Sequence, residues 1–175
     1  ICGNHDYYLL SGATCPRSRT ANLCLDYQRK IITDENFKWL GKSLTTFSID
    51  GVSCVHGGWK NPLDEYMLKI PDNYFNDYSF DVFASGHSHV QFKKNFANGK
   101  LYFNPGSVGQ PRDGDPCASF AVYSNKKVYL ERIGYNINEV KESVKLAGLP
   151  SYISDYLSRG EKIGGGIVES GLITI

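Results

Sequence analysis

The four histidines of this chain lie in three short motifs, and any fold that the chain adopts must account for that grouping. The motifs are Gly-Asn-His-Asp at residues 3–6, His-Gly-Gly at residues 56–58 and Gly-His-Ser-His at residues 86–89. Each motif contains glycine and follows an apolar or β-branched run, a pattern typical of a strand end where the backbone turns. Imidazole is the commonest protein ligand of mid-row divalent metals, so we expect the three motifs to converge on one site.

Composition limits the classes of protein to consider. With 175 residues, 41% of them hydrophobic, the chain is long enough for one domain with its own core. Nineteen basic and 18 acidic side chains give a formal net charge of +1, so we expect no stable nucleic-acid binding and no membrane binding. No apolar run is long enough to span a bilayer. Five cysteines without a Cys-x-x-Cys pair favour reduced thiols, and we expect a cytoplasmic protein.

Hydrophobic periodicity and turn residues divide the chain into helices and strands. The predicted helices cover residues 18–30, a short segment that begins at 33–36, and residues 61–69, 72–77, 138–147 and 151–159. The predicted strands form a hairpin over residues 47–56, a buried strand over 80–85, a hairpin around 98–99 and a hairpin over 118–134. This order indicates an α/β fold of layers, with the sheet covered by helices.

Both ends of the sequence carry an expectation. The chain starts at Ile1, with only Cys2 between it and the first motif, and its only methionine is Met67. We therefore expect that sequence preceding Ile1 is absent. Three successive glycines begin at residue 164, and we expect the segment from there onward to be a flexible tail or an irregular strand.

The spacing within the third motif indicates two metal ions. His87 and His89 are two residues apart, so an extended backbone would point them to opposite faces, and they share a site only if the turn twists them together. The spacing suits two neighbouring ions that each take one imidazole. Asn4 offers an amide oxygen, which suits manganese or iron. His5 would stand beside the ions and protonate a leaving oxygen or stabilise developing charge, with Asp6 holding the imidazole charged and oriented.

The ordered set Gly-Asn-His-Asp, His-Gly and Gly-His-x-His resembles the calcineurin-like metallophosphoesterase superfamily. Residues 104–112, Asn-Pro-Gly-Ser-Val-Gly-Gln-Pro-Arg, resemble a loop of its small prokaryotic phosphodiesterase branch, which includes YfcE-like proteins. The likeness extends from Ile1 to about Tyr135. It implies a layered α-β-β-α metallophosphoesterase sandwich, in which residues 1–175 form a single domain that lacks its N-terminal portion.

The resemblance also implies roles for the motif residues. It implies that Asn4, His56 and His87 coordinate the second metal ion and that His89 coordinates the first. His5 is implied to be the catalytic imidazole, paired with Asp6. The family pattern starts earlier with Asp-x-His and Gly-Asp motifs, which supply the other first-metal ligands and a bridging carboxylate. Those motifs are not in this sequence, so we expect the 175 residues alone to be incomplete for activity.

Other residues near the motifs have two interpretations each. Arg112 is a candidate substrate-binding residue that meets a phosphate bidentately, or it pairs with Asp113 or Asp115 in a solvated loop. Residues 104–107 contact substrate or form a tight turn that satisfies its own backbone. A set of aromatic residues between the second and third motifs is interpreted as core and rim packing rather than as a base-stacking platform: Tyr66, Tyr74, Phe75, Tyr78, Phe80 and Phe83.

The sequence thus predicts a metal-dependent phosphoester hydrolase, a phosphodiesterase or phosphatase, that uses a dinuclear centre to activate water for in-line attack at phosphorus. The expected cofactors are two divalent ions, with manganese favoured and iron, nickel or zinc compatible with the same ligands. The expected substrate is a small phosphoester, a nucleotide is permitted, and a homo-oligomer is left open. The alternative is a catalytically inactive scaffold of the same fold that binds partner proteins.

Overall fold

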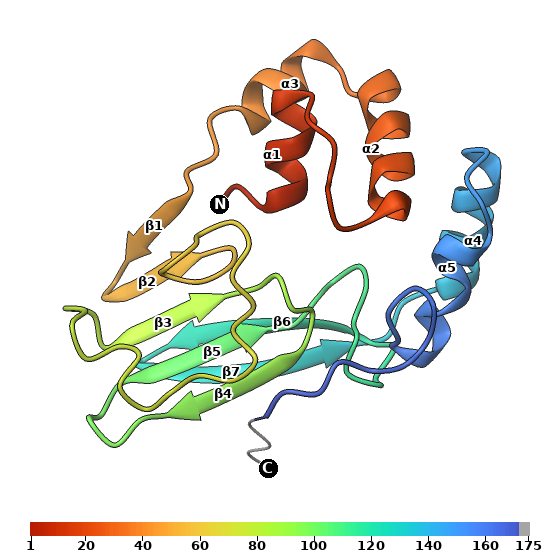
Figure 1. Ribbon diagram of the computed structural model, residues 1–175. Helices are drawn as coiled ribbons and strands as arrows, with labels where there is room; N and C mark the ends of the chain where they lie inside the picture. The colour runs from red at the N-terminus through yellow and green to blue at the C-terminus, as the bar shows by residue number, and fades with distance from the viewer. Residues whose placement is uncertain (172–175) are drawn as a thin grey trace.

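A computed structural model describes residues 1–171, and Figure 1 shows two β-sheets with helices gathered along one edge and at one end. In chain order the elements are α1 (Asn4–Ser11), α2 (Arg19–Ile31), α3 (Asp34–Leu40), β1 (Thr46–Ile49), β2 (Val52–Val55), β3 (Val82–Ser85), β4 (Gln91–Asn95), β5 (Leu101–Pro105), β6 (Ala118–Ser124), β7 (Lys127–Ile133), α4 (Ile137–Leu146), α5 (Tyr152–Asp155) and the 3₁₀ helix η1 (Leu157–Arg159). The three predicted hairpins and the predicted buried strand are all present.

The larger sheet sets the position of the motifs. Its five strands lie in the order β1-β2-β3-β5-β4, and β2, β3 and β5 run parallel while the two edge strands run antiparallel to their neighbours. The carboxyl ends of the three parallel strands therefore meet at one edge. His56 follows β2 directly, residues 86–89 follow β3, and the loop over residues 106–112 follows β5. This topology explains why distant motifs converge.

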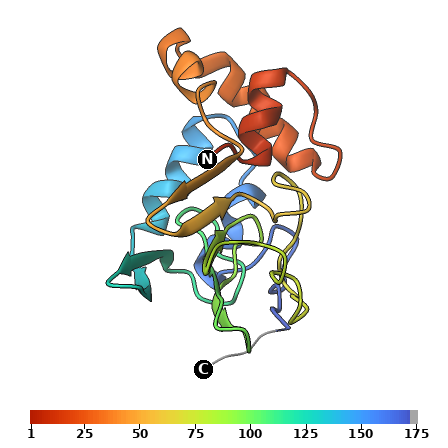
Figure 2. The same cartoon turned by 90° about the vertical axis from the view of Figure 1, so that its left-hand side faces the viewer.

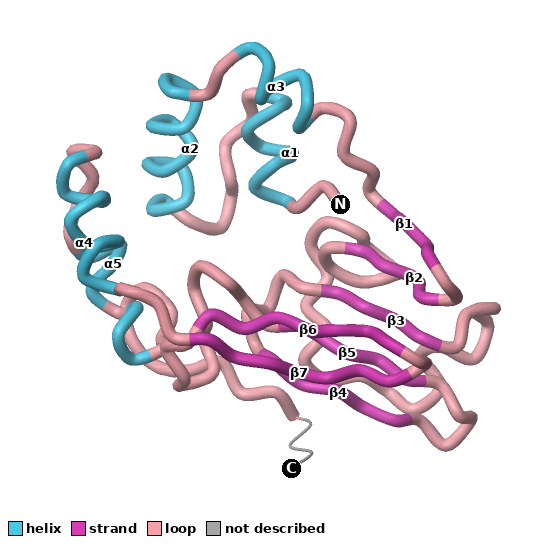
Figure 3. The backbone as a smooth tube through the Cα atoms, turned by 180° about the vertical axis from the view of Figure 1, so that it is seen from behind, coloured by secondary structure: helices cyan, strands magenta, loops and turns pink. Residues whose placement is uncertain are grey.

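The hairpin β6-β7 forms the smaller sheet, which packs on one face of the larger one. Alternation along the central strands decides which side chains meet it. Val82 of β3 and Phe103 of β5 face Val128 of β7, whereas their neighbours Phe83 and Tyr102 point to the opposite face. Figure 3 shows the hairpin running across this face of the larger sheet.

The opposite face is covered by an irregular segment, residues 57–81, and Figure 2 shows this segment and the β6-β7 hairpin on opposite sides of the larger sheet. The predicted helices over residues 61–69 and 72–77 are wrong, because both stretches form turns. Local polar contacts satisfy the backbone instead: the Glu65 carboxylate accepts hydrogen bonds from the Lys60 N–H and the Tyr74 hydroxyl. Five of the six aromatic residues in the predicted packing set belong to the core or pack against it, with Phe75 and Phe83 fully buried, whereas Tyr66 lines the cavity described below.

The first forty residues form a separate layer of helices. The first two predicted helices, over residues 18–30 and from residues 33–36, are confirmed as α2 and α3, and the hydroxyls of Ser18 and Thr33 cap them. Helix α1 was not predicted: the first motif was expected to sit in a turn at a strand end, and it begins a helix instead. The Gly3 N–H donates to the Asp6 carboxylate over 2.8 Å, which stabilises this first turn.

The C-terminal helices agree with the sequence in part. Helix α4 matches the predicted helix over residues 138–147, but the predicted helix over residues 151–159 divides into α5 and η1. Gly160 ends η1 with a left-handed backbone, φ 60°. Of the predicted irregular tail, residues 164–171 contain neither helix nor strand, and residues 172–175 lie outside the described part of the chain. Within residues 1–171 no helix is long and apolar enough to cross a membrane, and all five cysteines are free thiols.

Candidate metal centre

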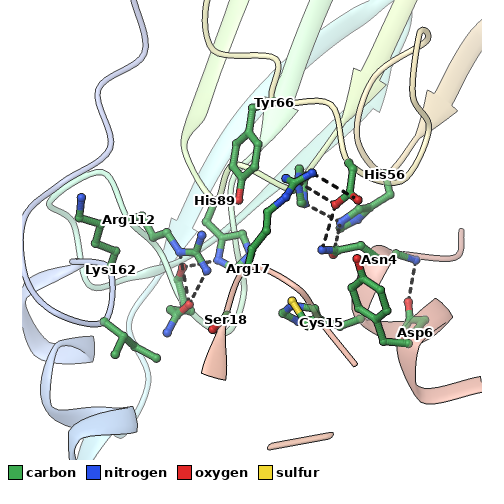
Figure 4. A pocket seen from close by; sticks show the side chains of 17 residues that line it. Asn4, Asp6, Cys15, Arg17, Ser18, His56, Tyr66, His89, Arg112 and Lys162 are labelled. Carbon is green, nitrogen blue, oxygen red and sulfur yellow. Dashed lines mark hydrogen bonds and ion pairs between the residues drawn. The ribbon is translucent and has the colours of Figure 1, made fainter. Parts of the chain in front are cut away.

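A cavity of about 320 Å³ opens at the carboxyl ends of the parallel strands, and every predicted metal ligand lines it. Figure 4 shows its side chains, which come from α1, the loop before α2, the strand ends and the C-terminal loop. The lining residues used below are Asn4, His5, Asp6, Arg17, His56, Asp64, Tyr66, His87, His89, Gln110, Arg112 and Lys162. The structure therefore brings together the three motifs that the sequence keeps fifty and thirty residues apart.

Three donor atoms meet at one point in this cavity. The Nε2 atom of His56 lies 3.1 Å from the Asn4 Oδ1 atom and 3.1 Å from the His87 Nδ1 atom. Whichever of the two ring nitrogens carries the proton, only one proton serves this group of three atoms. A cation would instead satisfy all three lone pairs, because an amide oxygen and two imidazole nitrogens are ordinary ligands of divalent metals. The donor set fits such an ion.

Burial keeps these imidazoles neutral, as metal binding requires. Burial, and next the neighbouring His56, lower the pKa of His87 to about 4. Burial is also the main cause that lowers the pKa of His56, with the carboxylates of Asp6 and Asp64 acting in the opposite direction. Within residues 1–171 no group of three His, Cys, Asp or Glu side chains is placed to hold a metal. The cluster has only two such ligands, since its third donor is the amide of Asn4.

The backbone at the third motif explains how two histidines two residues apart line one cavity. His87 has φ 64° and His89 has φ 61°, so neither is in an extended strand. This left-handed conformation is uncommon for residues other than glycine and is typical of functional sites. The buried Asn104 amide stabilises the turn by donating to the Gly86 carbonyl over 2.7 Å and to the Ser88 hydroxyl over 3.0 Å. Asn104 thus positions the motif rather than contacting the cavity.

His89 presents one ring nitrogen to the cavity. Its Nδ1–H donates to the backbone carbonyl of Gln110 over 2.7 Å, which fixes the tautomer and leaves Nε2 with a lone pair. Burial, followed by Arg112, lowers the pKa of His89 to about 3. The Ser107 hydroxyl accepts from the Gln110 N–H, so the loop after β5 holds the carbonyl that orients His89. Within residues 1–171 no hydrogen bond joins His89 to Asn4, His56 or His87, although the two other imidazoles contribute to lowering its pKa.

Asp64 is a site residue that the sequence did not reveal. Its Oδ1 atom lies 3.5 Å from the Asn4 Nδ2 atom and 3.9 Å from the His87 Nε2 atom, and its Oδ2 atom pairs with Arg17 at 3.4 Å. The His87 Nε2 atom is buried and has no hydrogen-bond partner within the described residues. A cation on Nδ1 would put the ring proton on Nε2, facing Asp64. A carboxylate behind a ligating histidine is a common arrangement in metal sites.

His5 and Asp6 occupy the rim of the cavity. His5 lines it while its side chain stays exposed to solvent. Asp6 was expected to orient His5, but its direct contact is with the Gly3 N–H, because adjacent helical residues point in different directions. Partial desolvation, and next Arg112, lower the pKa of His5, while Asp6 and Asp64 act to raise it. Asp6 thus favours the protonated imidazole through charge, as expected, but does not prevail over desolvation.

Arg112 does not form the loop ion pair that was one of its two interpretations. Asp113 and Asp115 both pair with Arg132, at 2.7 Å and 3.5 Å. The Arg112 guanidinium donates instead to the Gln110 side-chain oxygen, through Nη2 at 2.7 Å. Its Nη and Nε groups contact no carboxylate within residues 1–171, and it lines the cavity. This placement is compatible with the other interpretation, contact with a phosphate.

Sequence reasoning also missed three further residues that line the cavity. Arg17 lies in the loop before α2, Tyr66 in the irregular segment and Lys162 after η1. The Tyr66 ring packs on the His87 imidazole with the ring centroids 4.1 Å apart. None of the three lies next to a histidine motif, and no spacing signal in the sequence points to them. Only the folded arrangement brings them to the site.

Comparisons with known proteins show which family and which folds this chain resembles. Residues 1–127 match the family described as "Calcineurin-like phosphoesterase superfamily domain". An uncharacterized protein of Methanocaldococcus jannaschii is 29% identical over 183 residues, covering 91% of this chain and 74% of that protein. The crystal structure of a metallophosphoesterase from Sphaerobacter thermophilus has a TM-score of 0.76 at 24% identity, covering 91% of this chain and 76% of that one. A hypothetical protein from Pyrococcus horikoshii OT3 has a TM-score of 0.80 at 19% identity, covering 93% and 73%. The two structures confirm the predicted fold class.

Proposed function

Because this chain belongs to the calcineurin-like phosphoesterase superfamily, we propose that it hydrolyses phosphoesters with the help of divalent metal ions held in the cavity. One observation carries the proposal: the His56 Nε2 atom lies 3.1 Å from both the Asn4 Oδ1 atom and the His87 Nδ1 atom. These three residues and His89 line the cavity with uncharged metal-ligand atoms, and the same cavity also presents cationic side chains. That combination suits a cation and an anionic substrate.

Each residue has a distinct part in the proposed reaction. Asn4, His56 and His87 would hold one ion, and the free Nε2 of His89 would hold the other. Bound divalent ions lower the pKa of a water ligand and stabilise negative charge that develops on phosphoryl oxygens. His5, at the rim, would give a proton to the leaving oxygen. The Arg112 guanidinium would bind a non-bridging phosphate oxygen and orient the ester.

The finer assignments are part of the proposal. We favour a phosphodiester over a phosphomonoester, because residues 104–112 resemble a phosphodiesterase loop. Manganese is the favoured metal, since the amide oxygen of Asn4 suits a harder ion than zinc. A nucleotide is compatible with the cavity, although the aromatic residues that could stack on a base are mostly buried in the core.

The test is hydrolysis of bis-p-nitrophenyl phosphate and p-nitrophenyl phosphate by the purified full-length protein, stripped of metal and then supplied with manganese. We expect activity to return with manganese and to be greater on the diester. His87→Ala should abolish both manganese binding and activity. His5→Ala serves as the matched control, because it should lose activity while its manganese affinity, measured by calorimetry, stays near that of the wild type.

A folded protein that binds manganese but hydrolyses neither ester would contradict the proposal. In that case the scaffold alternative, a protein-binding role on the same fold, would be the better interpretation. Equal manganese affinity in the wild type and His87→Ala would show that the cluster of Asn4, His56 and His87 is not the metal site. The two readouts thus separate the site from the reaction.

A further inference from the structure

Two cations on one side of the cavity have no carboxylate partner within residues 1–171. Arg112 is half-buried and hydrogen-bonded only to neutral groups, and the exposed Lys162 ammonium makes no ion pair or hydrogen bond with residues 1–171. Figure 4 shows Arg112 and Lys162 together on one side, with Asn4 and His56 on the other and Arg17 between. Burial lowers the pKa of Arg112, which shows that its surroundings disfavour the charge they contain.

The carboxylates that line the cavity do not balance this charge. They are Asp6, which accepts from the Gly3 N–H, and Asp64, which pairs with Arg17. Both are already engaged on the side of the cavity where Asn4 and His56 lie. Arg112, which is half-buried, and Lys162, which is exposed, therefore offer two positive charges to an anion that enters this side of the cavity.

The position of Lys162 is built by backbone contacts. The Lys162 N–H donates to the Gly166 carbonyl over 3.1 Å, which closes a tight turn through the three glycines with left-handed backbones. Two bonds then tie this segment to the loop of Arg112: Val168 N–H donates to the Arg112 carbonyl over 2.6 Å, and Gly114 N–H donates to the Gly160 carbonyl over 3.0 Å. The glycine-rich segment, which the sequence predicted to be a flexible tail or an irregular strand, thus forms a turn that places Lys162 at the cavity.

We infer that the substrate carries a second phosphate, bound by Arg112 and Lys162, in addition to the phosphate that is hydrolysed beside Asn4, His56 and His87. The inference rests on the proposed function and names its substrate class, a small molecule that carries a second phosphate in addition to the phosphoester that is hydrolysed. One phosphodiester carries a single negative charge, which the metal side of the cavity would attract. On the opposite side, Arg112 and Lys162 bind the second phosphate and so favour substrates that carry one.

The experiment is calorimetric titration of the full-length protein in manganese with matched ligands that differ by one phosphate. The probes are propane-1,3-diol bisphosphate and monophosphate, and the corresponding hexane-1,6-diol pair, so that two phosphate spacings are sampled. We expect at least one bisphosphate to bind about tenfold or more tightly than its monophosphate, the gain typical of a charge-assisted contact. Lys162→Gln should remove most of that gain, while Lys127→Gln, which removes an equal charge at the exposed β6-β7 turn, should keep it.

Two results would overturn the inference. One is equal affinity for bisphosphate and monophosphate at both spacings. The other is an equal loss of bisphosphate affinity in Lys162→Gln and Lys127→Gln, which would indicate net charge rather than a site. The proposed function is judged separately by hydrolysis of bis-p-nitrophenyl phosphate, a diester with a single phosphate, so either idea can fail while the other stands.

Discussion

The Nε2 atom of His56 lies 3.1 Å from the Nδ1 atom of His87, so the two imidazoles share one proton between them. Protonation of both rings would place two cations in contact inside the protein. The Asn4 Oδ1 atom also lies 3.1 Å from the His56 Nε2 atom and helps to position this ring. Burial already disfavours a charge on either ring and lowers the pKa of both, so the pair favours the neutral state.

Stability without metal should fall as the pH is lowered from 7 to 5. Above the ordinary histidine pKa of 6.5, His87 and His89 are neutral in both the folded and the unfolded chain. Below 6.5 the unfolded chain binds protons, whereas the folded chain does not until the pH reaches about 4 for His87 and about 3 for His89. Each histidine then costs up to about 2 kcal/mol at pH 5.

Urea denaturation in the presence of a chelator checks this pH dependence. Carboxylates also titrate near pH 5, so wild type and His89→Gln are compared at both pH values. We expect the loss of unfolding free energy between pH 7 and pH 5 to be smaller in His89→Gln by about 1–2 kcal/mol. An identical loss in both proteins would show that His89 is not kept neutral by the fold.

Asp64 should position the metal ligands. Asp64→Asn keeps the shape of the side chain and its backbone hydrogen bond to Asn61, but removes the charge that faces the His87 Nε2 atom. We expect manganese affinity to fall about 10- to 100-fold, the usual effect of removing a partner behind a metal ligand. Calorimetry with manganese measures the change. Asp72→Asn, an exposed carboxylate paired with Lys94, is the control and should bind manganese like the wild type.

How far the sequence predicted the site depends on whether its signals were local. The Asp50-Gly51 turn could be recognised because those two residues adopt positive φ angles, 50° and 81°, which few other pairs accept. Glycine-flanked histidines after buried strands likewise marked strand ends. Once β2 and β3 were recognised, their parallel pairing brought His56 and His87 to one edge.

The rest depended on contacts between distant residues. Residues 61–69 have a helical pattern, but the Glu65 carboxylate and Tyr74 hydroxyl bind the segment into turns. Helix α1 begins inside a motif, where the Asp6 carboxylate that suggested a catalytic partner serves as a helix cap. Asp64 and Lys162 reach the cavity only because these irregular segments fold back on the sheet. No periodicity encodes such contacts.

Gly57 should be intolerant of a side chain. A Cβ atom there would lie 2.8 Å from the Asn61 carbonyl oxygen and 2.9 Å from the Asp64 nitrogen, closer than real Cβ atoms approach backbone. Gly57→Ala must therefore shift the turn that carries Asp64. We expect a loss of about 1–3 kcal/mol in unfolding free energy, together with weaker manganese binding. Gly134→Ala, where a Cβ would meet nothing within 4 Å, should change neither quantity.

Phe75 should connect the stability of the core to the metal site. Its side chain is fully buried, stacks on Phe83 of β3 with ring centroids 3.9 Å apart, and meets Trp59 edge-on at 5.1 Å. Phe75→Ala should lower the unfolding free energy by about 3–5 kcal/mol in urea denaturation, because it leaves a cavity beneath the irregular segment. Trp39→Ala removes a larger side chain that is 70% exposed, and should cost less than about 0.5 kcal/mol.

The same variant tests whether the packing of the irregular segment positions Asp64. If it does, Phe75→Ala should also weaken manganese binding at a temperature where the variant is still folded. Unchanged manganese affinity in a folded, destabilised variant would show that the turn around Gly57 is sufficient to position Asp64.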